Sequence, residues 1–292
     1  MRKKSALWLL SLLALLSLSC TLTIPLLPEV EVPRLEVGEM EEYTEEVSSA
    51  GVSSARVKIE QGIGDLSIAA GDPALLFSGV FRTNVAEWAP AVSWQNGRLD
   101  IEQGTTTGMP GAGAENQWEL AFSPDVELDM ELEIGAVDCE LDMGGLALTR
   151  LSIESGASDL VLRFDEPNRA EMERLRIQVG AANVDVGSIG NASPQNVRID
   201  GGVGNITLDL RGAWVSSSDI RITAGSGMLV LRLPRDVGVR VEMEGGLGSI
   251  EADPDLHDED GVYTNDAYGD AALNLLIEVT VGVGSVELEL EE

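Results

Sequence analysis

The chain of 292 residues is 44% hydrophobic but only 4% aromatic, which predicts a sizeable aliphatic core and excludes a disordered polyanion. Its formal net charge of −31 excludes nucleic acid as a partner, because phosphates would be repelled. The same charge disfavours direct adsorption to anionic lipid headgroups.

The N-terminus predicts export and a lipid anchor. Three basic residues at positions 2–4 precede an apolar run over residues 6–18, which has the length of a signal-peptide core and is too short to span a bilayer. The run ends at Ser17-Leu18-Ser19-Cys20 and resembles a bacterial lipoprotein signal, although Ser17 stands where that motif usually has Leu or Val. We therefore expect a signal peptide at 1–19, lipidation of Cys20 and a place on the extracytoplasmic face of a cell membrane. The alternative is ordinary signal cleavage nearby, with Cys20 incidental.

Residues 20–50 combine prolines with a glutamate-rich run, a composition that predicts an extended tether. Residues 51–125 are expected to form an N-terminal β region that contains a first repeat copy and an insert of about 50 residues. Asn96-Gly97 in that insert predicts a hairpin turn. The insert also carries Trp88, Trp94 and Trp118, large side chains suited to capping the first layer of a repeat stack.

A pattern of alternating apolar residues around a Gly-x-small-polar core recurs eight times from Val57 to the C-terminus. The leading glycines are Gly62, Gly135, Gly156, Gly180, Gly202, Gly225, Gly246 and Gly282. Apolar residues stand five and three positions before each glycine, and four and six positions after it, which is the period of a strand. The parity changes across the glycine, so the chain must bend there for both pairs to face one interior. We expect the glycine to supply unusual backbone angles, and the Asp, Asn or Ser that follows three residues later to bond the local backbone.

Two all-β folds fit this pattern. The favoured one is a β-solenoid of stacked coils of about 22 residues, with an N-terminal β-hairpin cap. Its repeats would occupy residues 126–292, with a loop insertion at 253–275. The alternative is an antiparallel β-sandwich in which each copy is a hairpin. Stacked equivalents explain why the same slot stays aliphatic in copy after copy, and outward glutamates in the last residues would protect a final edge strand.

Candidate chemistry is sparse. His257 is the single histidine and lies in an acidic loop, so we expect it to face solvent rather than to serve a catalytic triad. Cys139 occupies an apolar repeat slot and is expected to be a small buried hydrophobe. A calcium cluster could form from the acidic loop, although a solvated loop is the stronger interpretation; its acids are Asp253, Asp255, Asp258, Glu259 and Asp260. No catalytic residue, metal site or cofactor is predicted.

The Gly-x-Gly-[Asp/Asn/Ser] units and three longer segments together resemble the bacterial "toast-rack" family over residues 45–292. Those segments are APAVSWQNGRLDIEQ, PNRAEMERLRIQVGAANV and NDAYG. The family comprises envelope proteins, often lipoproteins, and the LiaF-type cell-envelope stress proteins carry a related β-repeat domain. The resemblance implies a β-stack at the cell envelope and carries over no catalytic residues.

The expected function is that of a non-enzymatic, surface-anchored lipoprotein with a structural, adhesive or envelope-maintenance role. Cell-wall polymers or envelope proteins are its expected partners. Two alternatives remain open. A polysaccharide-active enzyme is one, because β-solenoids host lyases and hydrolases that use acidic residues along one face. The other is an adhesin stiffened by calcium.

Overall fold

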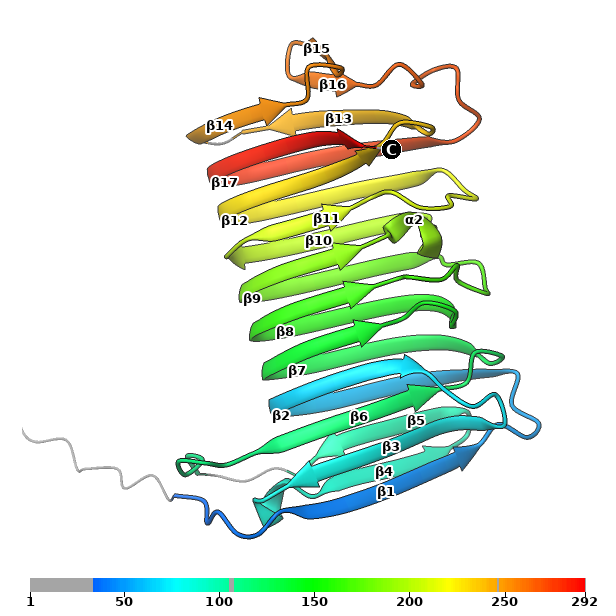
Figure 1. The fold of residues 1–292 in the computed structure, drawn as a ribbon, viewed down its shortest axis with the longest axis vertical. Helices are drawn as coiled ribbons and strands as arrows, with labels where there is room; N and C mark the ends of the chain where they lie inside the picture. Colours follow the sequence, from blue (N-terminus) through cyan, green and yellow to red (C-terminus); the bar gives the residue numbers. More distant parts are fainter. Residues whose placement is uncertain (1–33, 105–107, 246, 292) are drawn as a thin grey trace, which may run out of the picture.

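The computed structural model describes residues 34–104, 108–245 and 247–291. The predicted signal peptide at 1–19, Cys20 and the first part of the predicted tether lie outside these residues. Over the described chain, the strands join in one continuous sheet that winds into an elongated stack (Figure 1). The fold is the predicted β-solenoid.

Each repeat copy forms one layer, either as one long bent strand or as two short ones. The single strands are β2 (Ser54–Ala70), β7 (Glu127–Asp142), β8 (Ala147–Arg163), β9 (Arg174–Gly187), β12 (Ser218–Pro234) and β17 (Asn274–Glu291). The divided copies are β10 (Asn196–Val203) with β11 (Ile206–Asp209), and β13 (Gly238–Glu244) with β14 (Leu247–Ala252). Adjacent layers pair in parallel and in register, so that Val57 lies beside Met130 and Met130 beside Leu151. Parallel pairing between copies excludes the antiparallel sandwich.

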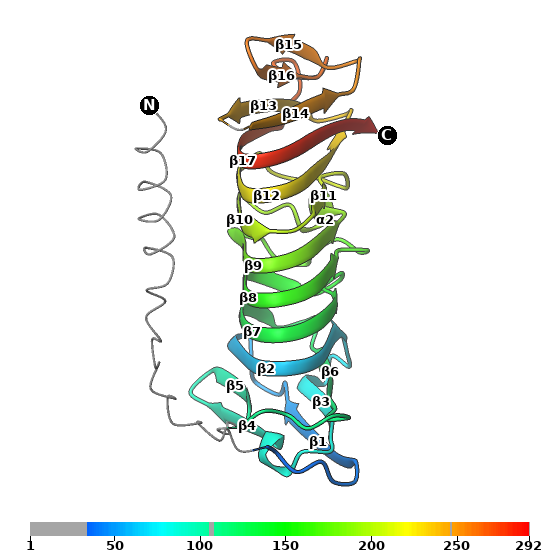
Figure 2. The same cartoon turned by 90° about the vertical axis from the view of Figure 1, so that its left-hand side faces the viewer.

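The predicted inward positions form the core. Val57, Ile59, Leu66 and Ile68 in the first layer are at most 2% exposed, and the equivalent residues repeat this burial through the stack. The layer formed by β13 and β14 is less completely buried: Met243 and Ala252 are partly buried, and Ile250 is 45% exposed. In the described copies both halves therefore face one aliphatic interior, as the parity change predicts. Figure 2 shows the strands of successive layers bending together.

The leading glycines serve layer contact rather than unusual backbone angles. A Cβ atom on Gly202 would lie 2.1 Å from the carbonyl oxygen of Gly180, and one on Gly135 would lie 2.2 Å from that of Gly62. Neither glycine has a positive φ, so the predicted reason for the glycine is wrong at this position. Unusual angles occur two residues later, where Gly204 has φ 141°.

The polar residues after the bend also connect layers. Asn183 Nδ2 donates to Asp159 Oδ1 at 2.9 Å, and Asn205 Oδ1 accepts from Met228 N at 3.3 Å. In these two copies the side chain bonds to a neighbouring coil and not, as expected, to the local backbone.

The N-terminal end is covered by the insert and the chain that precedes it. The elements are β1 (Glu41–Ser48), β3 (Leu75–Thr83), a 3-10 helix (Ala86–Trp88), β4 (Pro90–Gln95), β5 (Arg98–Gln103) and β6 (Asn116–Phe122). β5 and β6 pair in parallel with the two halves of β2 and so add an incomplete coil below it. The antiparallel strands β4, β3 and β1 then close this end, with the β4–β5 turn at the predicted Asn96-Gly97.

At this end the structure corrects one expectation, the length of the tether, and confirms another, the aromatic cap. The predicted tether of residues 20–50 is too long, because Glu41–Ser48 pairs with β3 as β1. The expectation of aromatic capping is confirmed by Trp118, which is 1% exposed and meets Phe81 edge to face at 5.1 Å.

At the other end the layers do not follow chain order. β17, the last copy, pairs with β12 on one side and with β13 and β14 on the other. The expectation that the final strand is an edge is therefore wrong, and β13 with β14 forms the last layer (Figure 1). The predicted loop insertion at 253–275 contains a short hairpin of β15 (His257–Glu259) and β16 (Val262–Thr264), and β16 pairs with β13.

A short helix, α2 (Ile189–Ala192), sits in the connection between β9 and β10. Within the part of the chain described, no helix has both the length and the apolar character needed to cross a membrane.

Candidate functional site

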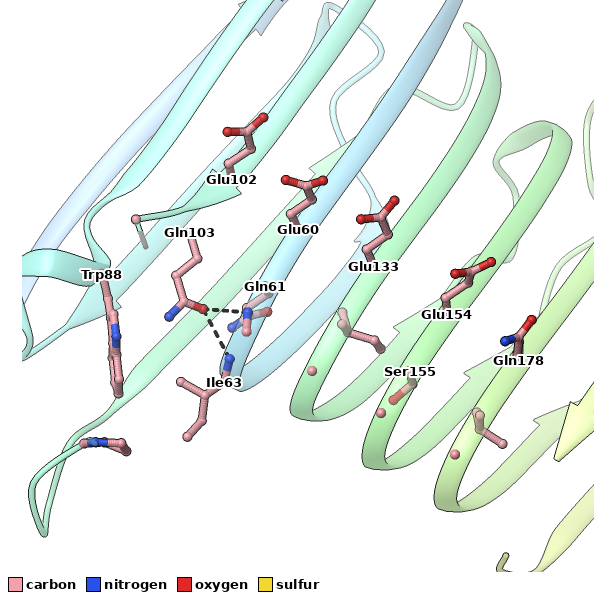
Figure 3. A pocket seen from close by; sticks show the side chains of 18 of the residues that line it. Glu60, Gln61, Ile63, Trp88, Glu102, Gln103, Glu133, Glu154, Ser155 and Gln178 are labelled. Atoms are coloured by element: carbon pink, nitrogen blue, oxygen red, sulfur yellow. Dashed lines mark hydrogen bonds between the residues drawn. The ribbon is translucent and has the colours of Figure 1, made fainter. Parts of the chain in front are cut away.

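A groove of about 970 Å³ runs along the bends of the first layers, beside the loops of the N-terminal cap (Figure 3). The leading glycines of β2, β7, β8 and β9 line it, so peptide backbone forms much of its surface. Leu35, Trp88 and Pro110 contribute from the cap. The groove lies where residues of the cap meet the glycine bends.

A row of carboxylates stands along this groove. Glu102, Glu60, Glu133 and Glu154 occupy equivalent outward positions on neighbouring strands, and Gln178 continues the row. Figure 3 shows these side chains projecting the same way from successive layers. Neighbouring strands lie about 4.8 Å apart, so the row concentrates negative charge at the spacing of the layers.

One lysine compensates part of that charge. Lys58 Nζ contacts Glu60 and lies 2.9 Å from Glu133 Oε1. Its hydrogen bonds to Glu60 and Glu133 raise the pKa of Lys58, and the same lysine lowers the pKa of Glu133. A general acid for glycoside cleavage needs a raised carboxyl pKa, so the shift at Glu133 runs against that role.

The cap fixes the first bend through side-chain amides. Gln103 Oε1 accepts hydrogen bonds from Gly62 N at 2.8 Å and Ile63 N at 3.3 Å, and Asn116 Nδ2 donates to Ile63 O at 2.8 Å. Gln61 is 2% exposed, and its Oε1 atom has no hydrogen-bond partner in the described structure. The groove therefore holds one buried acceptor with an unmet hydrogen bond.

Sequence reasoning missed this site, although a signal for it exists. Residues 56–61 read RVKIEQ and residues 98–103 read RLDIEQ, so the insert repeats the first half of the first copy. The repeat places Glu102 beside Glu60 and brings Gln103 to the first bend.

The residues singled out from sequence lie elsewhere. His257 is exposed, and its Nε2 lies 2.7 Å from Asp266 Oδ1 in the hairpin region. Cys139 is 4% exposed in its repeat slot, and burial raises the pKa of its thiol to about 12. The prediction of a small buried hydrophobe is confirmed.

The acidic loop does not assemble a ligand set. Asp255 pairs with Arg235 at 3.0 Å, while Asp258 Oδ1 accepts from Gly261 N at 3.1 Å. Among the residues with described positions, no three His, Cys, Asp or Glu side chains are grouped so that they could hold a metal ion.

Residues 36–187 match a family described as the N-terminal domain of toast_rack, DUF2154. Among solved structures, the chain is similar to a candidate cell adhesion protein from Clostridium sporogenes, with a TM-score of 0.52 and 18% identity over 87% of this chain and 100% of that one. It is also similar to a candidate adhesin from Bacteroides fragilis, with a TM-score of 0.36 and 11% identity over 87% and 99% of the two chains. No curated protein matches the sequence. The likeness to the Clostridium protein shows a shared fold.

Proposed function

The chain belongs to the toast-rack family, and on that premise we propose that it is a non-enzymatic adhesive protein of the bacterial cell envelope, held at the membrane through a lipid on Cys20. Family membership supports the envelope role, and the adhesion-related names of similar structures support an adhesive one. The signal-like segment ending at Cys20 supports the anchor.

The acidic groove is the observation that carries the adhesive part of the proposal. Its carboxylate row repeats with the layers, and the leading glycines bring peptide backbone to its surface. A repeating row of acceptors suits a repeating ligand that carries amines or hydroxyls, which is the chemistry of an amino-sugar polymer of the cell wall. The lowered pKa of Glu133 supports binding rather than acid catalysis.

Sedimentation of the protein with purified cell walls tests the adhesive role. We expect the wild type to pellet with the walls, and the double change Glu60→Gln and Glu154→Gln to reduce pelleting strongly. The matched control is Glu127→Gln with Glu140→Gln, which removes the same charge from exposed positions outside the groove. Equal loss in both variants, or release of reducing ends from the walls by the wild type, would contradict the proposal.

The anchor is tested separately in cells. Wild-type protein should incorporate labelled fatty acid and fractionate with membranes, whereas Cys20→Ser should do neither. Membrane association that survives this change would show that the anchor lies elsewhere, without bearing on the groove.

A further inference from the structure

A second hollow, of about 610 Å³, lies on the outer face of the strand halves that precede the bends. Its lining includes Arg174, Arg176, Arg198, Arg221 and Arg240, contributed by β9, β10, β12 and β13. The whole chain has only 19 Lys and Arg against 50 Asp and Glu, so this hollow gathers about a quarter of its basic residues. It is separate from the acidic groove, with which it shares no lining residue.

Three of these arginines form a column. Arg198 pairs in register with Arg176 on one side and with Arg221 on the other. Neighbouring strands lie about 4.8 Å apart, so three positive side chains start from adjacent positions. Like charges in direct register destabilise a sheet, and an anion between them would remove that cost.

Carboxylates compensate the column unevenly. Arg221 pairs with Glu278 at 2.6 Å and Arg198 with Asp200 at 2.7 Å. In contrast, Arg176 donates from Nη2 only to the neutral Gln178, and its Nε atom is buried without an acceptor. Within the described residues, Arg174 has no ion pair. Unmatched positive charge and an unmet donor therefore coincide at the Arg174–Arg176 end.

We propose that Arg174, Arg176 and Arg198 bind the phosphate group of a soluble or glycan-borne phosphate ester. A phosphate presents oxygens in several directions and can accept from the guanidinium groups of more than one strand at once. Asp200, a carboxylate beside the column, takes both of its bonds from Arg198 alone and leaves Arg174 and Arg176 without an anionic partner among the described residues. Asp219 and Glu278 also line the hollow, which favours one compact anion over an extended polyanion. The proposal rests on residues outside the acidic groove and stands independently of the adhesive function.

Isothermal titration with glycerol phosphate tests the site at about 0.01 M ionic strength, where charges interact over about 30 Å. We expect glycerol phosphate to bind the wild type saturably and glycerol not to bind. Arg176→Gln should weaken binding about tenfold or more, because it removes hydrogen bonds to a charged group. Arg98→Gln is the matched control, since it removes the same charge from the β4–β5 hairpin, where Arg98 pairs with Asp100 at 2.6 Å.

Absence of binding to the folded wild type, or equal weakening by the two variants, would overturn the site. Circular dichroism confirms that each variant is folded. Vesicles of phosphatidylglycerol distinguish the source of the phosphate. The net charge of −31 predicts that protein without its lipid will not pellet with them. Pelleting that Arg176→Gln abolishes would refute a soluble or glycan-borne ester and identify a lipid headgroup instead.

Discussion

At the bend, the absence of a side chain determines how closely the layers approach. Gly135, Gly180, Gly202, Gly225 and Gly282 each face a carbonyl oxygen of the layer below, at a distance that leaves no room for a methyl group. Gly62 differs, because the cap lies beneath it and the nearest atom to its missing Cβ is Gln103 Oε1 at 3.7 Å. The same position of the repeat is therefore open in the first copy and closely packed in the later copies.

The contrast gives a matched pair of substitutions. Gly202→Ala should destabilise the protein by about 1–3 kcal/mol, because the added methyl would overlap the Gly180 carbonyl and force the layers apart. Gly62→Ala should be neutral or stabilising by up to about 1 kcal/mol through the unfolded chain. Urea denaturation monitored by circular dichroism measures both, and equal destabilisation would show that the glycine is needed for backbone angles instead.

Cys139 makes stability depend on pH at the alkaline end. Burial raises the thiol pKa from 9.0 to about 12, so the folded state keeps a proton that the unfolded state loses. Stability should therefore fall as pH rises from about 9 towards 12, by about 1.4 kcal/mol per pH unit. Cys139→Val, which copies Val184 in the same slot, should lack this contribution.

Denaturation of both proteins at several pH values isolates the contribution of the thiol, because all other groups cancel in the difference. A difference that stays constant above pH 9 would mean that the thiol ionises normally in the folded protein.

Among the elements, β17 holds the far end of the stack together. It contacts β12 through 16 paired positions from Ser218 to Pro234 and also carries β13 and β14. Loss of a true terminal layer would leave the remaining layers intact, since repeats contact only their neighbours. Loss of β17 instead removes the support of the layer above it.

Truncation after residue 272 tests this arrangement. Amide protons of β13 and β14 should lose their protection against hydrogen exchange although both strands remain in the chain, while β7 and β8 should stay protected. The exposed edge of β12 should also promote self-association, visible by size-exclusion chromatography. Retained protection in β13 would mean that this layer is stable without β17.

The repeat pattern predicted the solenoid because inward positions obey a local rule of alternation, which Val57, Ile59, Leu66 and Ile68 follow. It did not predict that β17 lies between β12 and β13. Every layer presents similar apolar positions to its neighbours, so alternation alone does not determine the order in which the layers stack. The acidic groove was missed for a related reason. Its residues come together through the cap loops, whose paths the alternation does not specify.

At the scale of the whole molecule, acidic side chains far outnumber basic ones, and their mutual repulsion opposes the folded state. The ion pairs use most of the few basic residues, and a formal excess of 31 negative charges remains. These charges repel one another along the full length of the stack, most strongly where glutamates stand in a row beside the groove.

Added salt should therefore stabilise the protein. Raising ionic strength from about 0.01 M to about 0.15 M shortens the screening length from about 30 Å to about 8 Å, which weakens repulsion between layers. We expect the melting temperature to rise, by roughly 2–4 °C for each kcal/mol of repulsion removed. A fall with salt would indicate that the surface ion pairs outweigh the excess charge.

The position of β17 also affects the order in which the layers of the protein can fold. A polypeptide that emerges N-terminus first, from the ribosome or across a membrane, can complete its layers in order as far as β12. The segment that completes the far end has then not yet emerged, because β17 begins only at Asn274. Until the eighteen residues of β17 arrive, the edge of β12 lacks its native neighbour, so β13 must either stay unpaired or be displaced from that edge later. Chains that have emerged only as far as residue 273 should thus be the species that chaperones bind.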